Sequence, residues 1–249
     1  MESLEVDALA APPIELLADA SLFLDFDGTL VELAARPDSV RVDTRLATLM
    51  ERLHDRLDGR LALITGRGAG QVRALFDAPR FTVAGSHGLE FLYPDGRTAL
   101  APRPPTLDTA LAEMRAFAAA RPGLLVEDKP LGAALHYRCE PEAEADSIAL
   151  AQGLAARHGL YLQTGKMMIE LRAGGGDKGE ALRLLMASPE MAGTVPVFLG
   201  DDDTDEPGFI AAALLGGAGV LIGDERPTAA RYRLSGVAAV LDWLEEAAA

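Results

Sequence analysis

Short apolar runs alternate with helix-spaced leucines towards both ends of this sequence, and this alternation limits the possible folds more than any other feature. Residues 43–58 place apolar side chains at helical spacing, and further helices are predicted after Gly70 and over Ala181–Leu185. The short apolar runs are Ala20–Asp25, Leu61–Thr65, Phe81–Ala84, Val195–Leu199 and Val220–Ile222. Apolar runs as short as these are typical of strands buried on both faces, so the pattern predicts an α/β fold with a Rossmann-like parallel sheet.

The middle of the chain has a different pattern. The proline-rich segment 101–105 precedes a helical spacing that includes Leu107, Leu111 and Met114. Two predicted strands, a helix and two more strands follow, so the order is αββαββ. This order predicts an α+β domain of residues 101–172 inserted into a core domain of residues 1–100 and 173–249, with hinges near 97–105 and 173–176. The later predicted elements span 124–129, 132–138, 141–158, 161–166 and 167–172.

Composition excludes several classes of protein. The formal net charge of −15 disfavours binding to nucleic acid or anionic lipid, because both need basic side chains. One cysteine cannot form an internal disulfide, which favours a reducing compartment. The acidic first twenty residues do not resemble a signal peptide, and the apolar run 209–223 is too short to span a bilayer. We therefore expect a cytoplasmic protein that binds neither nucleic acid nor membranes.

The motif DFDGTL at 25–30 stands at the carboxyl end of the first predicted strand, where open α/β sheets bind ligands. Asp25 and Asp27 are two residues apart on an extended chain, so their side chains point to the same side. Gly28 permits a sharp turn, and Thr29 offers a hydroxyl and a backbone N–H. The motif predicts Asp25 as a nucleophile for phosphoryl transfer and Asp27 as its acid/base partner. An ordinary Asp-Gly turn is the alternative.

A second acidic motif, GDDDTDE at 200–206, follows the predicted strand Val195–Leu199. Its aspartates repel one another unless a cation lies among them. An EF-hand calcium loop would need glycine and glutamate where Glu206 and Ala212 stand, so that alternative fails. Carboxylate oxygens beside a phosphate favour Mg²⁺ as the cofactor.

Two single residues complete the candidate catalytic set. Thr65 ends a predicted strand and Lys178 begins a predicted helix, and a hydroxyl, an ammonium group and a helix N-terminus all suit phosphate oxygens. The chain has only three lysines among its 23 basic residues, Lys129, Lys166 and Lys178. Their retention indicates sites that need a compact point charge, with codon bias as the alternative.

These motifs resemble those of the haloacid dehalogenase phosphatase superfamily over nearly the whole chain, and the αββαββ insertion is similar to its C2B-type cap. A further set resembles the signature motifs of the trehalose-6-phosphate phosphatase family. Thr65 stands where that family often has serine, and Ala173 where it commonly has proline. The set comprises GSHG (85–88), EDK (127–129), HYR (136–138), GKMMIELR (165–172), DKG (177–179) and GDDDTDE (200–206).

The resemblance implies Mg²⁺-dependent hydrolysis of trehalose 6-phosphate, in trehalose biosynthesis, through an aspartyl-phosphate. Asp25 would attack phosphorus, and Asp27 would protonate the leaving sugar oxygen and then activate water. Thr65 and Lys178 would bind the phosphate oxygens. The metal ligands would be the Asp25 carboxylate, the Asp27 backbone carbonyl and Asp201, with Asp202 or Asp205 in support.

The same resemblance implies that the cap binds the sugar. Strand alternation places Glu127 and Lys129 on one face of the inserted sheet, and a solvated outer face is the alternative. His87 has a second possible role, the ordering of its glycine loop. The expected contacts in the cap are Glu127, Lys129, Glu170, Arg138 and Lys166, and those in the core are Thr29, Arg67 and His87.

Other functions stay open at this point. One is a different C2B phosphatase that acts on sucrose phosphate or a glycosylglycerate phosphate. Another is a phosphosugar mutase, which would move the phosphate within the sugar and release none. The third is a non-catalytic partner of a sugar synthase. Against it argues the intact set of Asp25, Asp27, Lys178 and Asp201. A small phosphosugar is the expected substrate, and a trehalose-phosphate synthase stays a candidate partner.

Overall fold

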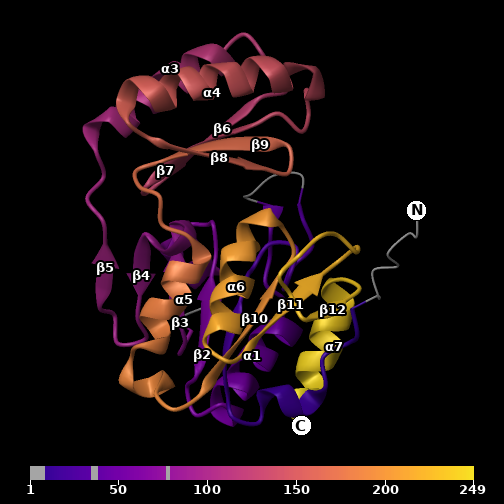
Figure 1. The fold of residues 1–249 in the computed structure, drawn as a ribbon. Coiled ribbons are helices and arrows are strands. Elements are labelled where there is room, and N and C mark those ends of the chain that lie inside the picture. The colour runs from indigo at the N-terminus through magenta and orange to yellow at the C-terminus, as the bar shows by residue number, and fades with distance from the viewer. Residues whose placement is uncertain (1–8, 35–38, 77–78) are drawn as a thin grey trace, which may run out of the picture.

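The computed structural model describes residues 9–34, 39–76 and 79–249, and these form two sheets (Figure 1). Residues 1–8, 35–38 and 77–78, which the predicted core domain includes, lie outside the described part. The larger sheet has the strand order β12-β11-β10-β1-β2-β3-β4-β5, and the smaller has the order β6-β7-β9-β8. The predicted fold class, a parallel α/β sheet with a separate antiparallel α+β unit, is confirmed.

The larger sheet is parallel from β12 to β3, and β4 and β5 extend it in antiparallel fashion. Asp25, Thr65 and Asp201 each come directly after a parallel strand, so all three reach the same edge of the sheet. The strands are β1 (Ala20–Leu24), β2 (Leu61–Ile64), β3 (Thr82–Gly85), β4 (Glu90–Leu92), β5 (Thr98–Leu100), β10 (Val195–Gly200), β11 (Ala218–Ile222) and β12 (Tyr232–Leu234).

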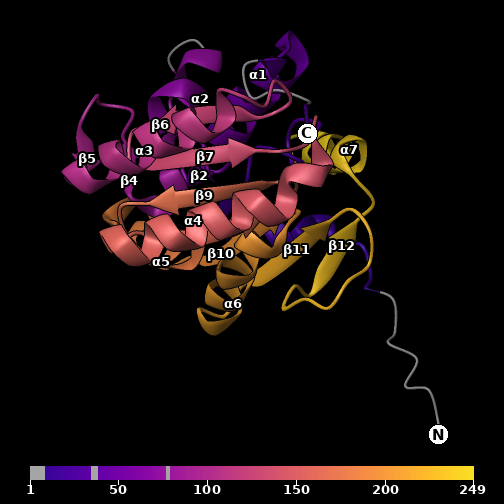
Figure 2. The same cartoon turned by 90° about the horizontal axis from the view of Figure 1, so that it is seen from above.

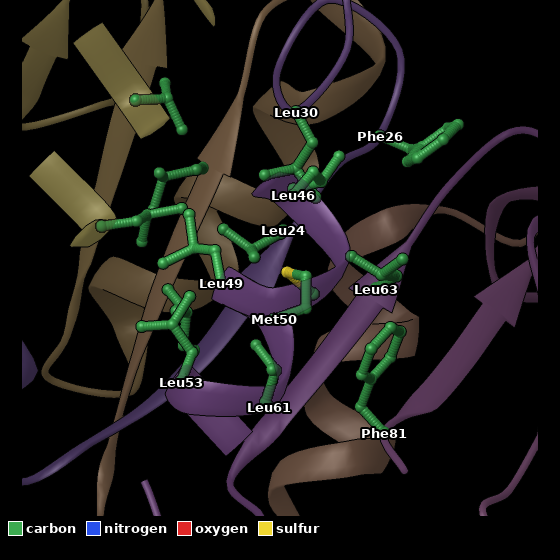
Figure 3. Packing of buried hydrophobic residues seen from close by; sticks show 14 of the residues in the cluster. Leu24, Phe26, Leu30, Leu46, Leu49, Met50, Leu53, Leu61, Leu63 and Phe81 are labelled. Atoms are coloured by element: carbon green, nitrogen blue, oxygen red, sulfur yellow. The ribbon is translucent and has the colours of Figure 1, made fainter. Parts of the chain in front are cut away.

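Helices cover both faces of this sheet. On one face, Leu22 and Leu24 of β1 pack with α1 (Thr44–Arg56), α2 (Ala69–Leu75) and α7 (Val237–Ala247), as Figure 3 shows for part of this core. On the other face, Phe23 packs with α5 (Lys178–Met186) and α6 (Glu206–Leu214). Alternate residues of one strand therefore enter opposite cores, which explains why the strand is apolar throughout.

The smaller sheet lies over the carboxyl edge of the parallel strands, and its two helices cover the side away from the core (Figures 1 and 2). Leu135 of β7 and Ile169 of β9 pack against these helices. Because side chains alternate along a strand, neighbours such as Glu170 face the larger sheet. The elements are β6 (Leu125–Lys129), β7 (Gly132–His136), β8 (Tyr161–Gly165), β9 (Met168–Arg172), α3 (Pro105–Ala118) and α4 (Glu144–His158).

Several elements differ from the sequence-based expectation. Strands β7 and β8 end at His136 and Gly165, so Arg138 and Lys166 lie in the turns beyond them. The periodicity of the sequence did not predict β4, β5, β12, α6 or α7. The three strands have three residues each, too few for a pattern, and α6 is apolar on all sides, so it lacks an amphipathic signal. In the described part of the chain, no helix has both the length and the apolar composition needed to cross a membrane.

Candidate active site

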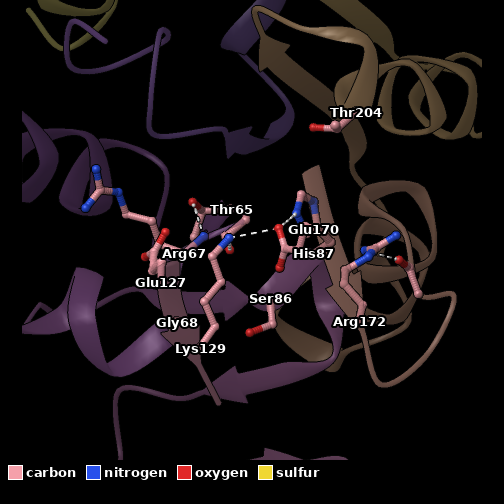
Figure 4. Close-up of polar contacts among 12 residues, drawn as sticks. Thr65, Arg67, Gly68, Ser86, His87, Glu127, Lys129, Glu170, Arg172 and Thr204 are labelled. Atoms are coloured by element: carbon pink, nitrogen blue, oxygen red, sulfur yellow. Dashed lines mark hydrogen bonds and ion pairs between the residues drawn. The ribbon is translucent and has the colours of Figure 1, made fainter. Parts of the chain in front are cut away.

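A cavity of about 180 Å³ lies between the carboxyl edge of the larger sheet and the polar face of the smaller one (Figure 4). Thr29 and Asp205 do not line it, and both are fully buried. Every other residue predicted for the site lines this cavity. They are Asp25, Asp27, Thr65, Arg67, His87, Glu127, Lys129, Arg138, Lys166, Glu170, Lys178, Asp201 and Asp202.

Lys178 holds two carboxylates together at the floor of the cavity. Its Nζ donates to Asp25 Oδ1 at 2.7 Å and to Asp205 Oδ1 at 2.6 Å. Burial raises the pKa of Asp205 to about 7, and it raises the pKa of Asp25 as well. Burial opposes the charged form of Lys178, but the two carboxylates outweigh it and raise the pKa of the ammonium group. The lysine is therefore a permanent cation beside Asp25.

Asp205 organises the acidic loop. Its Oδ2 accepts the backbone N–H groups of Asp201 at 2.9 Å and Asp202 at 3.0 Å. Asp202 Oδ1 in turn accepts the N–H of Thr204 at 2.8 Å and its hydroxyl at 2.7 Å. These bonds direct the loop N–H groups inward and leave the Asp201 carboxylate facing the cavity.

The donor atoms of this loop fit a divalent cation. Ligand oxygens of Asp25, Asp201 and Asp205 lie within 4.8 Å of one another. Hard carboxylate oxygens are the ligands that Mg²⁺ prefers. Since Lys178 and two N–H groups already engage both oxygens of Asp205, Asp25 and Asp201 are the better direct ligands.

Asp27 is oriented by an arginine from the neighbouring strand end. Arg67 Nε and Nη2 donate to the two Asp27 oxygens at 2.5 and 2.7 Å, a bidentate ion pair. The Arg67 N–H also donates to Thr65 Oγ1 at 3.2 Å. The short TGR segment thus links the predicted acid/base to the predicted phosphate-binding hydroxyl.

Three buried groups join the two sheets at the cavity wall. Lys129 Nζ donates to Glu170 Oε2 at 2.8 Å and to the Gly66 carbonyl at 3.2 Å (Figure 4). His87 Nε2 lies 3.7 Å from the same Glu170 oxygen. Burial alone would raise the pKa of Glu170, but Lys129 and His87 outweigh burial and lower it to about 2. Burial lowers the pKa of His87 to about 4, so this imidazole is neutral at pH 7.

Two residues in the turns of the smaller sheet reach the core directly. Lys166, in the turn between β8 and β9, donates to Asp201 Oδ2 at 2.9 Å. Arg138 donates to the Ala34 carbonyl at 2.8 Å. Positive groups of the inserted segment therefore meet both the acidic loop and the segment after DFDGTL.

His136 also lines the cavity, although no role was predicted for it from the sequence. Its Nε2 lies 3.0 Å from Glu127 Oε2, and both residues line the cavity. Burial opposes the charge on Glu127, but His136 and Lys129 outweigh it and lower the pKa of this carboxyl. The HYR motif and strand alternation contained the signal. Gln163, Met168 and Thr204 line the cavity too, but no role was predicted for any of the three. Met168 and Thr204 belong to the GKMMIELR and GDDDTDE motifs, whereas Gln163 lies outside every motif.

The arrangement suits transfer of an anionic group from a polyol. The core supplies a buried carboxylate beside a permanent cation, a second carboxylate two residues along, and a carboxylate cluster that fits a metal. The smaller sheet supplies acidic and basic hydrogen-bonding groups on the opposite wall. Hydroxyl-rich ligands need this mixture of donors and acceptors.

Comparisons with known proteins point to one family. The trehalose-phosphatase family model matches residues 23–237. The sequence is 39% identical to the trehalose-6-phosphate phosphatase of Escherichia coli over 93% of this chain and 87% of that protein. It is 38% identical to a probable trehalose-phosphate phosphatase of Sinorhizobium fredii over 83% of this chain and 79% of that one. The fold resembles the C-terminal domain of Candida albicans trehalose-6-phosphate phosphatase, with a TM-score of 0.83, 21% identity, and coverage of 97% of this chain and 98% of that domain.

Proposed function

The chain belongs to the trehalose-phosphatase family of phosphoric monoester hydrolases, and from this we propose that it hydrolyses trehalose 6-phosphate to trehalose and phosphate in trehalose biosynthesis. One observation carries the proposal. The cavity combines the buried Asp25–Lys178 pair with the polar wall formed by Glu127, Lys129 and Glu170. The Asp25–Lys178 pair suits phosphoryl transfer, and the polar wall suits the binding of a sugar.

We further propose a division of labour along the chain. Residues 1–100 and 173–249 form the catalytic core, and residues 101–172 form a cap that binds the sugar. Hinges near 97–105 and 173–176 would let the cap open for substrate exchange. Contacts between the two parts, such as Lys166 with Asp201 at 2.9 Å, place the polar face of the smaller sheet against the cavity, which supports this division.

In the proposed reaction, Asp25 attacks the phosphorus atom. An O–P bond forms to its carboxylate, and the bond from phosphorus to the sugar oxygen breaks. Asp27 donates a proton to the leaving oxygen, which would otherwise depart as a strongly basic alkoxide. Asp27 then takes a proton from water as that water attacks phosphorus, which releases phosphate and restores the Asp25 carboxylate.

Neighbouring groups of the core make this attack feasible. Lys178, held 2.7 Å from Asp25, would offset the negative charge of the phosphate, and the Thr65 hydroxyl would donate to a phosphate oxygen. Arg67 would keep Asp27 oriented until substrate enters. Mg²⁺ bound by Asp25, the Asp27 carbonyl and Asp201 would supply further positive charge, with Asp202 and Asp205 shaping the loop.

The cap would recognise the sugar hydroxyls. Glu127 and Glu170 supply acceptors, Lys129 supplies donors, and Arg138 and Lys166 supply further positive groups at the edge of the cavity. His87 would contact substrate from the core side. A contact from Thr29 stays a prediction, since its hydroxyl is buried outside the cavity lining.

Phosphate release from a substrate panel tests the proposal. Trehalose 6-phosphate, sucrose 6-phosphate, glucose 6-phosphate and mannosylglycerate phosphate would each be assayed with Mg²⁺ and with EDTA. We expect Mg²⁺-dependent release from trehalose 6-phosphate, and a loss of at least about a thousandfold in Asp25→Asn. Asp242→Asn is the control, because this aspartate of α7 has a side chain that is 73% exposed and does not line the cavity.

The alternative outcomes are distinct. Faster phosphate release from another sugar phosphate would contradict trehalose 6-phosphate as the substrate but would leave the proposed hydrolysis intact. Movement of phosphate within the sugar, without release, would indicate a mutase. No turnover of any sugar by folded protein would contradict catalysis altogether.

A further inference from the structure

Arg226 contacts the acidic loop from outside the cavity. It lies between β11 and β12, in a segment to which the proposed reaction assigns no role. Its Nη2 donates to the backbone carbonyl of Asp202 at 2.8 Å. Its Nη1 donates to Glu206 Oε1 at 2.6 Å and lies 3.3 Å from Asp203 Oδ1. One guanidinium thus contacts three successive parts of the GDDDTDE motif.

Glu206 fixes the arginine in turn. Its second oxygen, Oε2, accepts the backbone N–H of Ala229 at 2.8 Å. The contacts therefore run from the Asp202 carbonyl through Arg226 and Glu206 back to the β11–β12 connection. A planar guanidinium suits this arrangement because it donates in several fixed directions at once.

The acidic loop requires a stabilising contact from outside, such as the one that Arg226 provides. Its aspartates repel one another, and this repulsion favours a more open loop. The Asp202 carbonyl belongs to the second peptide after the Asp201 Cα, so a shift of this carbonyl turns the Asp201 carboxylate. Arg226 does not line the central cavity, so it can affect the reaction only through its contacts with the loop or through its charge.

We propose that Arg226 is a positioning residue that holds the Asp201 carboxylate in place for the metal. The inference rests on the proposed Mg²⁺ site. Partners that orient metal ligands typically change metal affinity by about 10- to 100-fold when they are removed. The residue acts through the Asp202 carbonyl and Glu206, and it contacts neither substrate nor the reacting atoms.

A purely electrostatic role and a positioning role of Arg226 predict opposite changes in Mg²⁺ affinity for Arg226→Gln. If only charge mattered, loss of a nearby cation would tighten the binding of Mg²⁺. If position matters, the loosened loop weakens Mg²⁺ binding by about tenfold despite the loss of the positive charge. The measurement is the Mg²⁺ dissociation constant from calorimetry on the full chain without substrate.

Three further variants complete the experiment. Arg231→Gln is the matched control, because Arg231 is an exposed arginine of the same connection that lies over the Tyr232 ring, 5.4 Å from its centroid. It should bind Mg²⁺ as the wild type does. Glu206→Gln should weaken binding, and the double variant should be no worse than Arg226→Gln alone, since both residues act through one contact.

Failures of the inference and of the proposed function are distinguishable. Equal or tighter Mg²⁺ binding by folded Arg226→Gln, or additive effects of the two substitutions, would overturn the positioning role and leave the phosphatase reaction intact. A wild-type chain that does not bind Mg²⁺ would overturn the metal site itself. A loss of affinity in Arg231→Gln as large as that in Arg226→Gln would show that any substitution in this connection loosens the loop, and it would also reject the inference.

Discussion

At the scale of single residues, Gly28 shows how an absent side chain makes room for a functional one. Its φ of +85° lies in the left-handed region, where glycine is favoured. A Cβ atom at this position would lie 2.3 Å from Asp201 Oδ2. Glycine therefore lets the DFDGTL turn approach the acidic loop closely enough for carboxylate oxygens of Asp25 and Asp201 to lie within 4.8 Å of each other.

Gly28→Ala and Gly96→Ala separate backbone strain from this steric clash. Gly96 has a φ of +84°, and a Cβ atom there would meet no atom of the described residues within 4 Å. Gly96→Ala should reduce the free energy of unfolding by about 1–2 kcal/mol, the usual cost of a left-handed non-glycine residue, and Gly28→Ala should reduce it by more because of the clash. Only Gly28→Ala should also lose phosphatase activity, because it displaces Asp201. Denaturant unfolding and phosphate release measure the two effects, and an active Gly28→Ala would contradict the argument.

At the scale of elements, helix starts deliver functional groups. Helix α5 begins at Lys178, and the preceding residue, Asp177, caps it by accepting the N–H of Glu180 at 2.8 Å. The cap orients the first turn, and the first turn carries the lysine that pairs with Asp25. Helix α1, remote from the cavity, has the same device, since Asp43 accepts the N–H of Leu46 at 2.8 Å.

Asp177→Ala and Asp43→Ala form a matched pair of variants, because each removes the side-chain cap at the start of one helix. Loss of either cap should lower the free energy of unfolding by about 1 kcal/mol. Asp177→Ala should in addition lower kcat, because the first turn of α5 frays and Lys178 is less well held. Asp43→Ala should keep wild-type turnover. Equal kcat values in both variants would show that the α5 cap serves stability alone.

At the scale of the whole molecule, the contact between the two sheets is a pH-sensitive part of the structure. His87 in the core faces Glu170 in the smaller sheet, and burial lowers the pKa of His87 from 6.5 to about 4. Between pH 6.5 and about 4 the unfolded chain therefore binds a proton that the folded chain does not. Stability falls as the pH drops through this window. Glu170, with a pKa lowered to about 2, adds a second loss below its ordinary 4.5.

The slope of stability against pH tests this linkage. Acidification from pH 7 to pH 4 should remove up to about 3 kcal/mol of unfolding free energy through His87. His87→Asn cannot titrate, so its unfolding free energy should fall less over the same range. Urea unfolding at several pH values provides the comparison. Parallel slopes in the two proteins would rule out His87 as the source.

The sequence by itself determined the chemistry that gathers at one edge of the sheet. Asp25, Thr65 and Asp201 each follow an apolar run, and the carboxyl ends of parallel strands always share an edge. The break in pattern at residue 101 likewise predicted a separate antiparallel unit. Both signals are local, because a few consecutive side chains set the period and the strand end.

Only the tertiary structure decided which of these groups pair. These pairs are linked by hydrogen bonds across a loop or between strands. They are Arg67 with Asp27, His136 with Glu127, and Arg226 with Asp202. The turn after Asp27 also buries the Thr29 hydroxyl, which the motif alone placed at the site. Such contacts depend on strand order and on turn geometry within each sheet. Chain separation carries no information about these distances, so they are set only when the strands pair.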